Sequence, residues 1–397
     1  MEKIDPQFIA RTLNTLPQGV VLVSGTNGKT TTTKMVVELL EGQGMRVFTN
    51  RTGSNFTRGV AAALLGEVSS EGILEADIAV LELDEAHAVH FVRAIQPNYS
   101  LLLNVMRDQL DRFGEIDTTA NLLHIIAEHT TDGIVINRDD PRLGTEAFQK
   151  SLTAPVQTYG VNPKLLSQFP SDDSMREGSI NNAHVSRASA NDVSLEAIDH
   201  QHATVKFNGQ LREIHLKLKG IYNVQNAVGA LALTRMILGD KLDEAKLLQS
   251  LANVTPAFGR GESLIVDGKE CELVLVKNPS GFRLSLKSFS PDGYATMVAI
   301  NDDYADGRDM SWLWDVDFDS LKTEGVAMLT GIRAFDMALR LQYDEVEPSK
   351  VEPNISVALR EFISANSDKP KRIYCTYTAM LAIRRNLSKQ TNVEVVR

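Results

Sequence analysis

Hydrophobic and polar positions alternate along the first half of the chain in a way that predicts strands separated by helices. Short apolar runs rich in β-branched residues are typical of buried strands. They occur in "GVVLVSG" (19–25), "RVFTN" (46–50), "DIAVLELDE" (77–85), "YSLLLNV" (99–105) and "GIVINRDD" (133–140). Helical patterns lie between them, most clearly in "KTTTTKMVVELLEGQG" (29–44). This alternation predicts the α/β class, with a parallel, doubly wound sheet covered by helices on both faces.

The pattern changes twice in the second half of the chain. Residues 153–210 are polar and weakly patterned, so we expect an insertion with short strands, including "ATVKFNG" (203–209) and "REIHLKL" (212–218). Helical periodicity returns within 223–254. A second α/β alternation then begins near Pro256, with strands expected in "ELVLVK" (272–277), "ATMVAIND" (295–302), "VAMLTG" (326–331) and "RIYCTY" (372–377). We therefore predict two domains, one over residues 1–255 and a C-terminal α/β domain over residues 256–397.

The charge balance and the cysteine content restrict the partners and the compartment. The chain has 41 basic and 51 acidic residues and a formal net charge of −10, which disfavours binding to nucleic acid or to an anionic membrane surface. Its two cysteines, Cys271 and Cys375, are too few for a disulfide scaffold or a four-thiolate zinc site. The start "MEKIDPQFIA" does not resemble a signal peptide, and no apolar run reaches membrane-spanning length. We expect a cytoplasmic protein.

The segment "SGTNGKTTTT" has the parts of a phosphate-binding loop. Such a loop needs a strand, a glycine-containing turn with exposed amides, a lysine, a hydroxyl residue and a helix N-terminus. All of these are expected here in that order, although Val23 stands where the usual P-loop pattern has its first glycine. The candidate nucleotide-binding residues are Gly25, Thr26, Asn27, Gly28, Lys29, Thr30 and Thr31. The alternative is a glycine-rich helix start with an exposed lysine.

A nucleotide site with a metal ion also needs a carboxylate, and the strand "IAVLELDEAH" supplies three. They are Glu82, Asp84 and Glu85, and a carboxylate in so apolar a strand is costly unless it is paired or bound to metal. We select Glu82, with Thr30 as the second Mg²⁺ ligand. The alternative is a carboxylate that meets solvent at the end of the strand.

Motifs along nearly the whole chain resemble the Mur ligases and folylpolyglutamate synthases, which use ATP to activate a carboxylate as an acyl phosphate. The early motifs are "SGTNGKTTT", "LELDE", "NVMRDQLDRFGE", "GIYNVQNAVGALAL" and "FGRGE". The later ones, "VKNPSGF", "INDDYADGRDMSWLWDVDF", "GIRAFDMALRL" and "YCTYTAM", resemble the MurT family, the synthetase subunits of lipid II isoglutaminyl synthases. The resemblance implies a Mur-ligase-like central ATPase domain, with Asn226 near the adenine and Arg260 in contact with the nucleotide.

Departures from the other Mur ligases point to a different acceptor. Where those ligases have a histidine, this chain has Gln109, and where they have Asp-His before "NP" it has Val276 and Lys277. No lysine in "GEIDTTANLLHII" matches their carbamylated residue. The phosphate loop starts at Ser24, so we expect no substrate-binding domain before it. These differences fit an enzyme in which ammonia, rather than an amino acid, attacks the activated carboxylate.

The middle segment also departs from many MurT-like chains, which carry a four-cysteine zinc ribbon there. Residues 153–210 contain no cysteine, and we interpret His184, His200 and His202 as scattered surface residues. We therefore expect no structural zinc.

The resemblance implies a reaction and a partner. With ATP and Mg²⁺, the chain is expected to amidate the α-carboxylate of D-glutamate in the stem peptide of lipid II, at the inner face of the membrane. Lys29 and Glu82 are the expected catalytic residues of phosphoryl transfer. The ammonia is expected from a glutamine amidotransferase subunit (GatD-like) in a heterodimer, because Cys271 and Cys375 lie in strand-like segments and suit buried structural thiols better than a glutaminase nucleophile.

The segment "ADGRDMSWLWD" is the expected contribution to that partner. In the family, a carboxylate of this motif is thought to orient the histidine of the amidotransferase, and here Asp309 is the first candidate and Asp306 the second. The neighbouring Trp312 and Trp314 favour an interface over a solvated acidic loop. Two other functions stay open, namely a folylpolyglutamate-synthase-like ligase and a scaffold that only senses ATP.

Overall fold

A computed structural model of the chain contains two compact units. It describes residue 5 and residues 7–50, 57–108, 116–177, 192–199, 201–256, 260–389 and 391. The first unit comprises Met1–Met106 and Glu115–Thr255, and the second comprises Arg107–Gly114 and Pro256–Arg397.

The first unit is built on a nine-stranded sheet of order β2-β3-β1-β4-β5-β6-β7-β8-β9. Strands β1 to β7 are parallel to one another, whereas β8 and β9 add an antiparallel extension beside β7. The predicted parallel, doubly wound α/β sheet is thus confirmed. The strands are β1 (Val20–Ser24), β2 (Val47–Thr49), β3 (Ile78–Glu82), β4 (Tyr99–Leu102), β5 (Gly133–Asn137), β6 (Val156–Val161), β7 (Val193–Asp199), β8 (His202–Phe207) and β9 (Gln210–His215).

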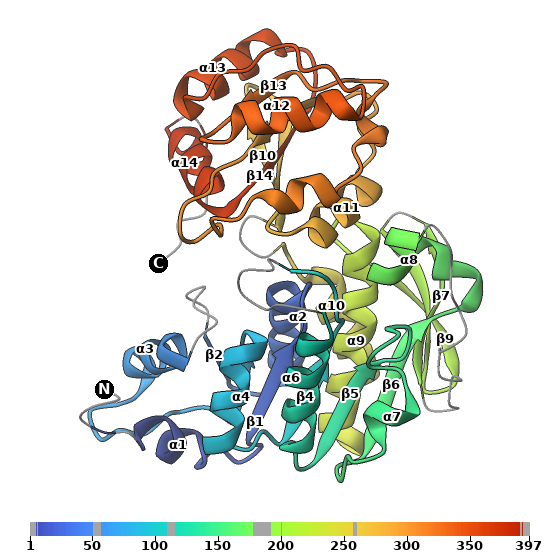
Figure 1. Ribbon diagram of the computed structural model, residues 1–397. Coiled ribbons are helices and arrows are strands. Elements are labelled where there is room, and N and C mark those ends of the chain that lie inside the picture. Colours follow the sequence, from blue (N-terminus) through green and yellow to red (C-terminus); the bar gives the residue numbers. More distant parts are fainter. Residues whose placement is uncertain are drawn as a thin grey trace. The chain divides into compact units, whose positions relative to one another are not determined.

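Helices cover both faces of this sheet because alternate residues of each strand point to opposite sides. In β1, Val21 and Val23 pack in one hydrophobic cluster with α2, α9 and α10, while Val20 and Leu22 pack in another with α1, α3, α4 and α6. Figure 1 shows β1 in blue beside α2 and α4. The helices are α1 (Phe8–Leu13), α2 (Lys29–Gly42), α3 (Thr57–Glu67), α4 (Glu85–Ala94), α6 (Ile116–Glu128), α7 (Glu146–Gln149), α8 (Asp172–Glu177), α9 (Ile221–Leu238) and α10 (Glu244–Asn253).

The described parts of the polar segment 153–210 contribute strands to the sheet of the first unit. Its first strand, β6, was not predicted and continues the parallel sheet beside β5. The two strands expected at its end are present as β8, which pairs with β7, and β9, which pairs with β8. His184 and His200 lie outside the described residues, and His202 is exposed at the start of β8.

The second unit contains a five-stranded sheet of order β10-β11-β14-β12-β13. Strands β11, β14, β12 and β13 are parallel, and β10 forms an antiparallel hairpin with β11 that the sequence pattern did not predict. The strands are β10 (Arg260–Val266), β11 (Lys269–Leu275), β12 (Ala295–Ala299), β13 (Met328–Thr330) and β14 (Lys371–Cys375). The helices are α11 (Pro279–Ser288), α12 (Ala334–Tyr343), α13 (Ile355–Ala365) and α14 (Tyr377–Leu387), with 3₁₀ turns η3 (Ser311–Asp315) and η4 (Asp319–Leu321).

Candidate active site

The predicted phosphate loop connects β1 to α2 at the carboxyl end of the sheet. The chain leaves β1 toward β2 and β3 on one side and later returns to β4 on the other side, so the loop lies at a topological switch point, where ligands of such sheets bind. Gly28 precedes α2 with φ of 88°, a conformation that favours glycine. The first helical bond runs from the Thr32 amide to the Gly28 carbonyl oxygen over 2.9 Å. The amides of Thr30 and Thr31 precede it and suit an anion.

Lys29 is buried within this loop. Its Nζ lies 2.6 Å from the carbonyl oxygen of Gly25 and 3.1 Å from Oε1 of Glu85, at the start of α4. The Lys29 and Glu85 side chains are only 4% and 2% exposed. The alternative of an exposed lysine is therefore wrong. An ammonium held beside the first turn of a helix has the charge that a phosphate group needs.

Thr30 and Glu82 form the second pair of the site. The hydroxyl of Thr30, in the first turn of α2, donates to Oε1 of Glu82, at the end of β3, over 2.8 Å. The side chain of Asn50 fixes the backbone of Glu82 through both its amide nitrogen and its carbonyl oxygen. A hydroxyl beside a carboxylate is a donor set that suits Mg²⁺, which usually takes few protein ligands together with phosphates.

The three carboxylates at the end of β3 have different contacts. Glu82 bonds Thr30 and Glu85 pairs with Lys29, whereas Asp84 caps α4 by accepting from the amide of Ala86 over 3.3 Å. Within the described residues, no group of three or more His, Cys, Asp or Glu side chains is arranged to hold a metal ion. The sequence predicted Thr30 and Glu82 as the two protein ligands of Mg²⁺. The fold brings these two side chains together.

Asn226 lies against the loop from the neighbouring helix. It lies six positions into α9, partly buried, and a Cβ atom on Gly28 would come within 2.7 Å of its Oδ1. The close approach of α9 therefore gives Gly28 a second reason to lack a side chain. The structure thus brings Asn226 to the phosphate loop, although nearly half of the chain lies between them in the sequence.

A strap formed by Asn104 and Met106, just after β4, holds the loop from the other side. The carbonyl oxygen of Asn104 accepts from the Thr26 amide over 3.0 Å. Its side chain accepts from the Asn27 amide and donates to the Asn27 carbonyl oxygen, each over 2.9 Å. The Thr26 hydroxyl bonds the amide and the carbonyl oxygen of Met106. These bonds occupy the amides of Thr26 and Asn27, so the phosphate-facing amides begin farther along the loop.

Asp140 fixes this strap to the sheet. Its buried carboxylate follows β5 and accepts from the amide of Val105, between Asn104 and Met106, over 2.7 Å. It also accepts from the amides of Arg142 and Leu143 over 2.9 and 3.1 Å. Burial raises the pKa of Asp140, and these amide bonds oppose that rise. Neither the strap nor Asp140 was predicted. The polar residues at the ends of two predicted strands, in "NV" and "NRDD", could have indicated that these strand ends contribute to the site.

Asp306 and Asp309 have contrasting surroundings in the second unit. Asp306 is buried, and its carboxylate accepts from the amide of Thr378 over 2.8 Å and from the Thr378 hydroxyl. Burial raises the pKa of Asp306. Asp309 is partly exposed and accepts from the amide of Ser311 over 2.9 Å. Hydrogen bonds from the hydroxyl and the amide of Ser311 lower the pKa of Asp309, so it stays ionised.

The remaining predicted residues are distributed over the second unit. Arg260 begins β10, and its side chain lies outside the described residues. Cys271 and Cys375 are buried in β11 and β14, as predicted. Burial raises the pKa of Cys271 to about 12 and raises that of Cys375 as well, so neither thiol is an activated nucleophile. Trp312 is buried in the core, contrary to the expectation of paired indoles at an interface, because only Trp314 is exposed.

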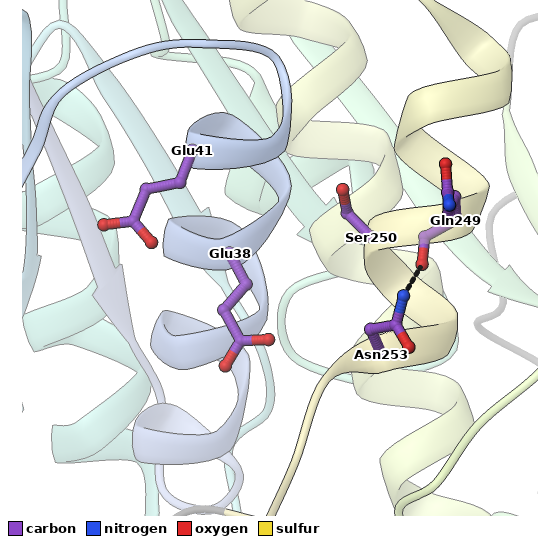
Figure 2. Close-up of a pocket in the computed structure, with 5 residues that line it drawn as sticks. All are labelled: Glu38, Glu41, Gln249, Ser250 and Asn253. Carbon is purple, nitrogen blue, oxygen red and sulfur yellow. Dashed lines mark hydrogen bonds between the residues drawn. The ribbon is translucent and has the colours of Figure 1, made fainter.

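A shallow pocket elsewhere in the first unit contains none of the predicted residues. It lies between α2 and α10 and is lined by Glu38, Glu41, Gln249, Ser250 and Asn253 (Figure 2). Glu38 lies nine residues along α2 from Lys29, or about 13 Å at the helical rise of 1.5 Å per residue. This pocket is therefore separate from the phosphate loop.

Comparison with known proteins identifies the family. The sequence model of the Mur ligase middle domain matches residues 23–234, and that of the MurT ligase C-terminal domain matches residues 275–380. A lipid II isoglutaminyl synthase (glutamine-hydrolyzing) subunit MurT of Streptococcus pneumoniae is 30% identical, over 98% of this chain and 92% of its own length. The chain belongs to the MurT family of Mur ligases. A MurT subunit of Staphylococcus aureus is 28% identical, over 89% of this chain and 84% of its own length.

The solved structures agree with this membership at the level of the fold. The MurF ligase of Thermotoga maritima, solved in complex with ADP, has a TM-score of 0.68 and 16% sequence identity to this chain, a likeness that shows the fold alone. The match covers 98% of this chain and 82% of MurF. As a MurT-family member, the chain is an ATP-dependent ligase subunit, and a subunit implies a partner. The folylpolyglutamate-synthase alternative is less supported, because the relatives named MurT match nearly the whole chain.

Proposed function

We propose that this chain uses ATP to activate the α-carboxylate of D-glutamate in the stem peptide of lipid II, which ammonia then converts to D-isoglutamine. The observation that carries the proposal is the pairing of Lys29 with Glu85 and of Thr30 with Glu82 around one helix N-terminus. The names of the relatives support the substrate. Residues 1–255 act as the ATP-binding middle domain, and residues 256–397 carry the motif that meets the partner.

The reaction proceeds in two steps. An oxygen of the substrate carboxylate attacks the γ-phosphorus of ATP, and ADP leaves with the electrons of the broken P–O bond. Ammonia then attacks the carbonyl carbon of the acyl phosphate, inorganic phosphate leaves, and the nitrogen loses a proton to form the amide. Phosphoryl transfer needs positioning and charge neutralisation more than covalent participation of the protein.

Each residue of the loop has a defined part in phosphoryl transfer. Lys29 balances the negative charge of the terminal phosphates, and the amides at the start of α2 donate to phosphate oxygens. Thr30 and Glu82 would hold Mg²⁺, which supplies further neutralisation of phosphate charge when it is bound. Gly25, Thr26, Asn27 and Gly28 keep the backbone close to the nucleotide. Asn226 contacts the adenine region, which its position beside Gly28 supports, and Arg260 contacts the nucleotide.

A separate glutamine amidotransferase subunit, of the GatD kind, supplies the ammonia. Both cysteines of this chain are buried, so the glutaminase nucleophile belongs to the partner. Asp309 orients the partner's catalytic histidine, since a carboxylate on imidazole fixes its tautomer and stabilises its charged form. Asp306 is a poorer candidate because Thr378 already occupies its carboxylate.

The reaction takes place at the inner face of the membrane, where the lipid-linked substrate is found. Among the described residues, no helix combines the length and the apolar character that a membrane span requires.

The test is amidation of lipid II by the chain co-purified with its amidotransferase partner. We expect amidation that needs ATP and either glutamine or a high concentration of ammonium salt. Asp309→Asn should abolish the glutamine-dependent reaction and leave the ammonium-dependent reaction intact, because only the glutaminase half of the complex uses Asp309. Unchanged glutamine-dependent amidation by Asp309→Asn would exclude the assignment of this residue, and no amidation with either nitrogen source would exclude the function.

A further inference from the structure

Helix α12 presents a row of large apolar side chains to solvent. Its buried side is formed by Ala334, Met337 and Leu341, as expected of a helix that covers a sheet. The exposed residues that we call the α12 stripe are Phe335, Leu339 and Tyr343 on the opposite side of the helix, with Ile332 two residues before its start; their side chains are 50–71% exposed. The spacing of four residues between Phe335, Leu339 and Tyr343 places these three side chains in one line along the helix. In Figure 1, α12 lies in front of the strands of its unit.

The α12 stripe is continuous with the loop that carries Asp309. Trp314, about half exposed, packs its ring against Tyr343 with centroids 5.0 Å apart. Arg340 of α12 donates to the carbonyl oxygens of Leu313 and Val316, over 3.2 and 2.5 Å. At the other end of the helix, Arg333 binds Asp302 over 2.6 Å. The helix and the segment 302–316 are thus tied together at both ends, so a molecule that contacts Asp309 is adjacent to the stripe.

The composition of this surface is unusual for a face that stays in water. Single exposed apolar residues need no explanation, but contiguous exposed apolar patches of this kind mark interaction sites. Aromatic side chains such as Phe335, Tyr343 and Trp314 are also the types that anchor protein interfaces.

We propose that the α12 stripe, together with Trp314, is the docking surface for the glutamine amidotransferase subunit. The inference rests on the proposed function, because Asp309 must reach the histidine of that subunit. Charge favours this occupant over a second copy of the chain. The loop beside the stripe carries exposed or partly exposed carboxylates, namely Asp303, Asp309, Asp315 and Asp317. In a dimer of two copies joined through the stripe, these carboxylates would face the same carboxylates of the other copy. A partner with a protonated histidine and a basic rim complements them.

The experiment measures the affinity of the full chain for its separately purified amidotransferase subunit by isothermal titration calorimetry. Phe335→Ala/Leu339→Ala removes two anchors that are exposed in the isolated chain, so the fold should persist, as an unchanged thermal midpoint would verify. We expect Kd to rise at least tenfold, with glutamine-dependent amidation falling at limiting partner concentration. Ile265→Ala is the matched control, because Ile265 is 61% exposed on β10, at the opposite edge of the same sheet from β13.

Several outcomes separate this proposal from the proposed function. A double variant that binds the partner within twofold of the parent chain would overturn the docking surface, even if the parent complex amidates lipid II. A parent chain that forms a dimer with itself, lost in the double variant, would assign the stripe to a second copy and also overturn the proposal. Ammonium-dependent amidation should be unaffected by Phe335→Ala/Leu339→Ala, and its absence in the parent chain would instead refute the proposed function.

Discussion

The buried pair of Lys29 and Glu85 makes a strong prediction about stability. Their charged atoms are 3.1 Å apart and both side chains are almost fully buried. At an effective dielectric constant of about 20, their Coulomb attraction is roughly 5 kcal/mol, which is offset by the loss of hydration of both charges. Replacing one partner leaves the other charge buried without it, which typically costs about 3–5 kcal/mol. Lys29→Met and Glu85→Gln should each lose about this much unfolding free energy.

The measurement is a double-mutant cycle by urea unfolding. Because Lys29→Met/Glu85→Gln removes both charges together, it should recover much of the loss, with a coupling energy of about 2 kcal/mol or more. Lys350 and Glu361 provide the control pair, since they are 2.7 Å apart but about half exposed, and their coupling should stay below about 1 kcal/mol. A coupling energy for Lys29 and Glu85 no larger than that of the control pair would refute the reasoning.

The double variant of this cycle also separates loss of catalysis from loss of stability in the functional test of the phosphate loop. Loss of ATP turnover in Lys29→Met alone has two explanations, an absent ammonium or an unstable loop around Glu85. The double variant lacks the ammonium without leaving Glu85 ionised, so it should be stable and still inactive. If this stable variant turned over ATP at the parent rate, Lys29 would have no part in phosphoryl transfer.

Three further predictions concern the surroundings of the site. Asp140→Asn should weaken ATP binding in a calorimetric titration and cost about 1.5–3 kcal/mol of stability, because it breaks a charged hydrogen bond to the Val105 amide; parent-like affinity would contradict a positioning role. Burial raises the pKa of Asp139 to about 6, so the folded state holds its proton more tightly than the unfolded state. Stability should therefore fall by about 1 kcal/mol between pH 5 and 7 through this group, and Asp139→Asn should remove that part of the slope in urea midpoints. Cys271 and Cys375 should react with a thiol reagent only on unfolding, and fast reaction of the native chain would contradict their burial.

The sequence predicts the framework well because the framework depends on local patterns. The apolar run of β1, the glycines of the loop and the amphipathic pattern of α2 each determine their own conformation. Alternating strands and helices then imply a parallel sheet, in which the loop after β1 and the carboxylates after β3 meet at the same edge. For this reason Thr30 and Glu82, 52 residues apart, could be paired before the structure was known.

Other contacts depend on register and could not be predicted. The strap reaches the loop because Ser24 pairs with Leu102 in the sheet, which places Asn104 opposite Asn27. Three carboxylates lie close together after β3, and the residues at which β3 ends and α4 begins decide which of them faces Lys29. A shift of one residue in either boundary would change that choice. Trp312 and Trp314 differ in burial for the same reason, since a shift of two positions in a 3₁₀ turn moves a side chain from the core to the surface.

The central claim is that the chain activates a carboxylate by phosphorylation, and the fate of an oxygen isotope tests it most directly. Lipid II whose D-glutamate α-carboxylate carries ¹⁸O on both oxygens would be amidated by the complex with ATP and glutamine. Because the acyl phosphate passes one carboxylate oxygen to phosphate, we expect one ¹⁸O in inorganic phosphate for each amide formed, with ADP as the nucleotide product. Amide formation with unlabelled phosphate, or with the label in AMP, would contradict the claim.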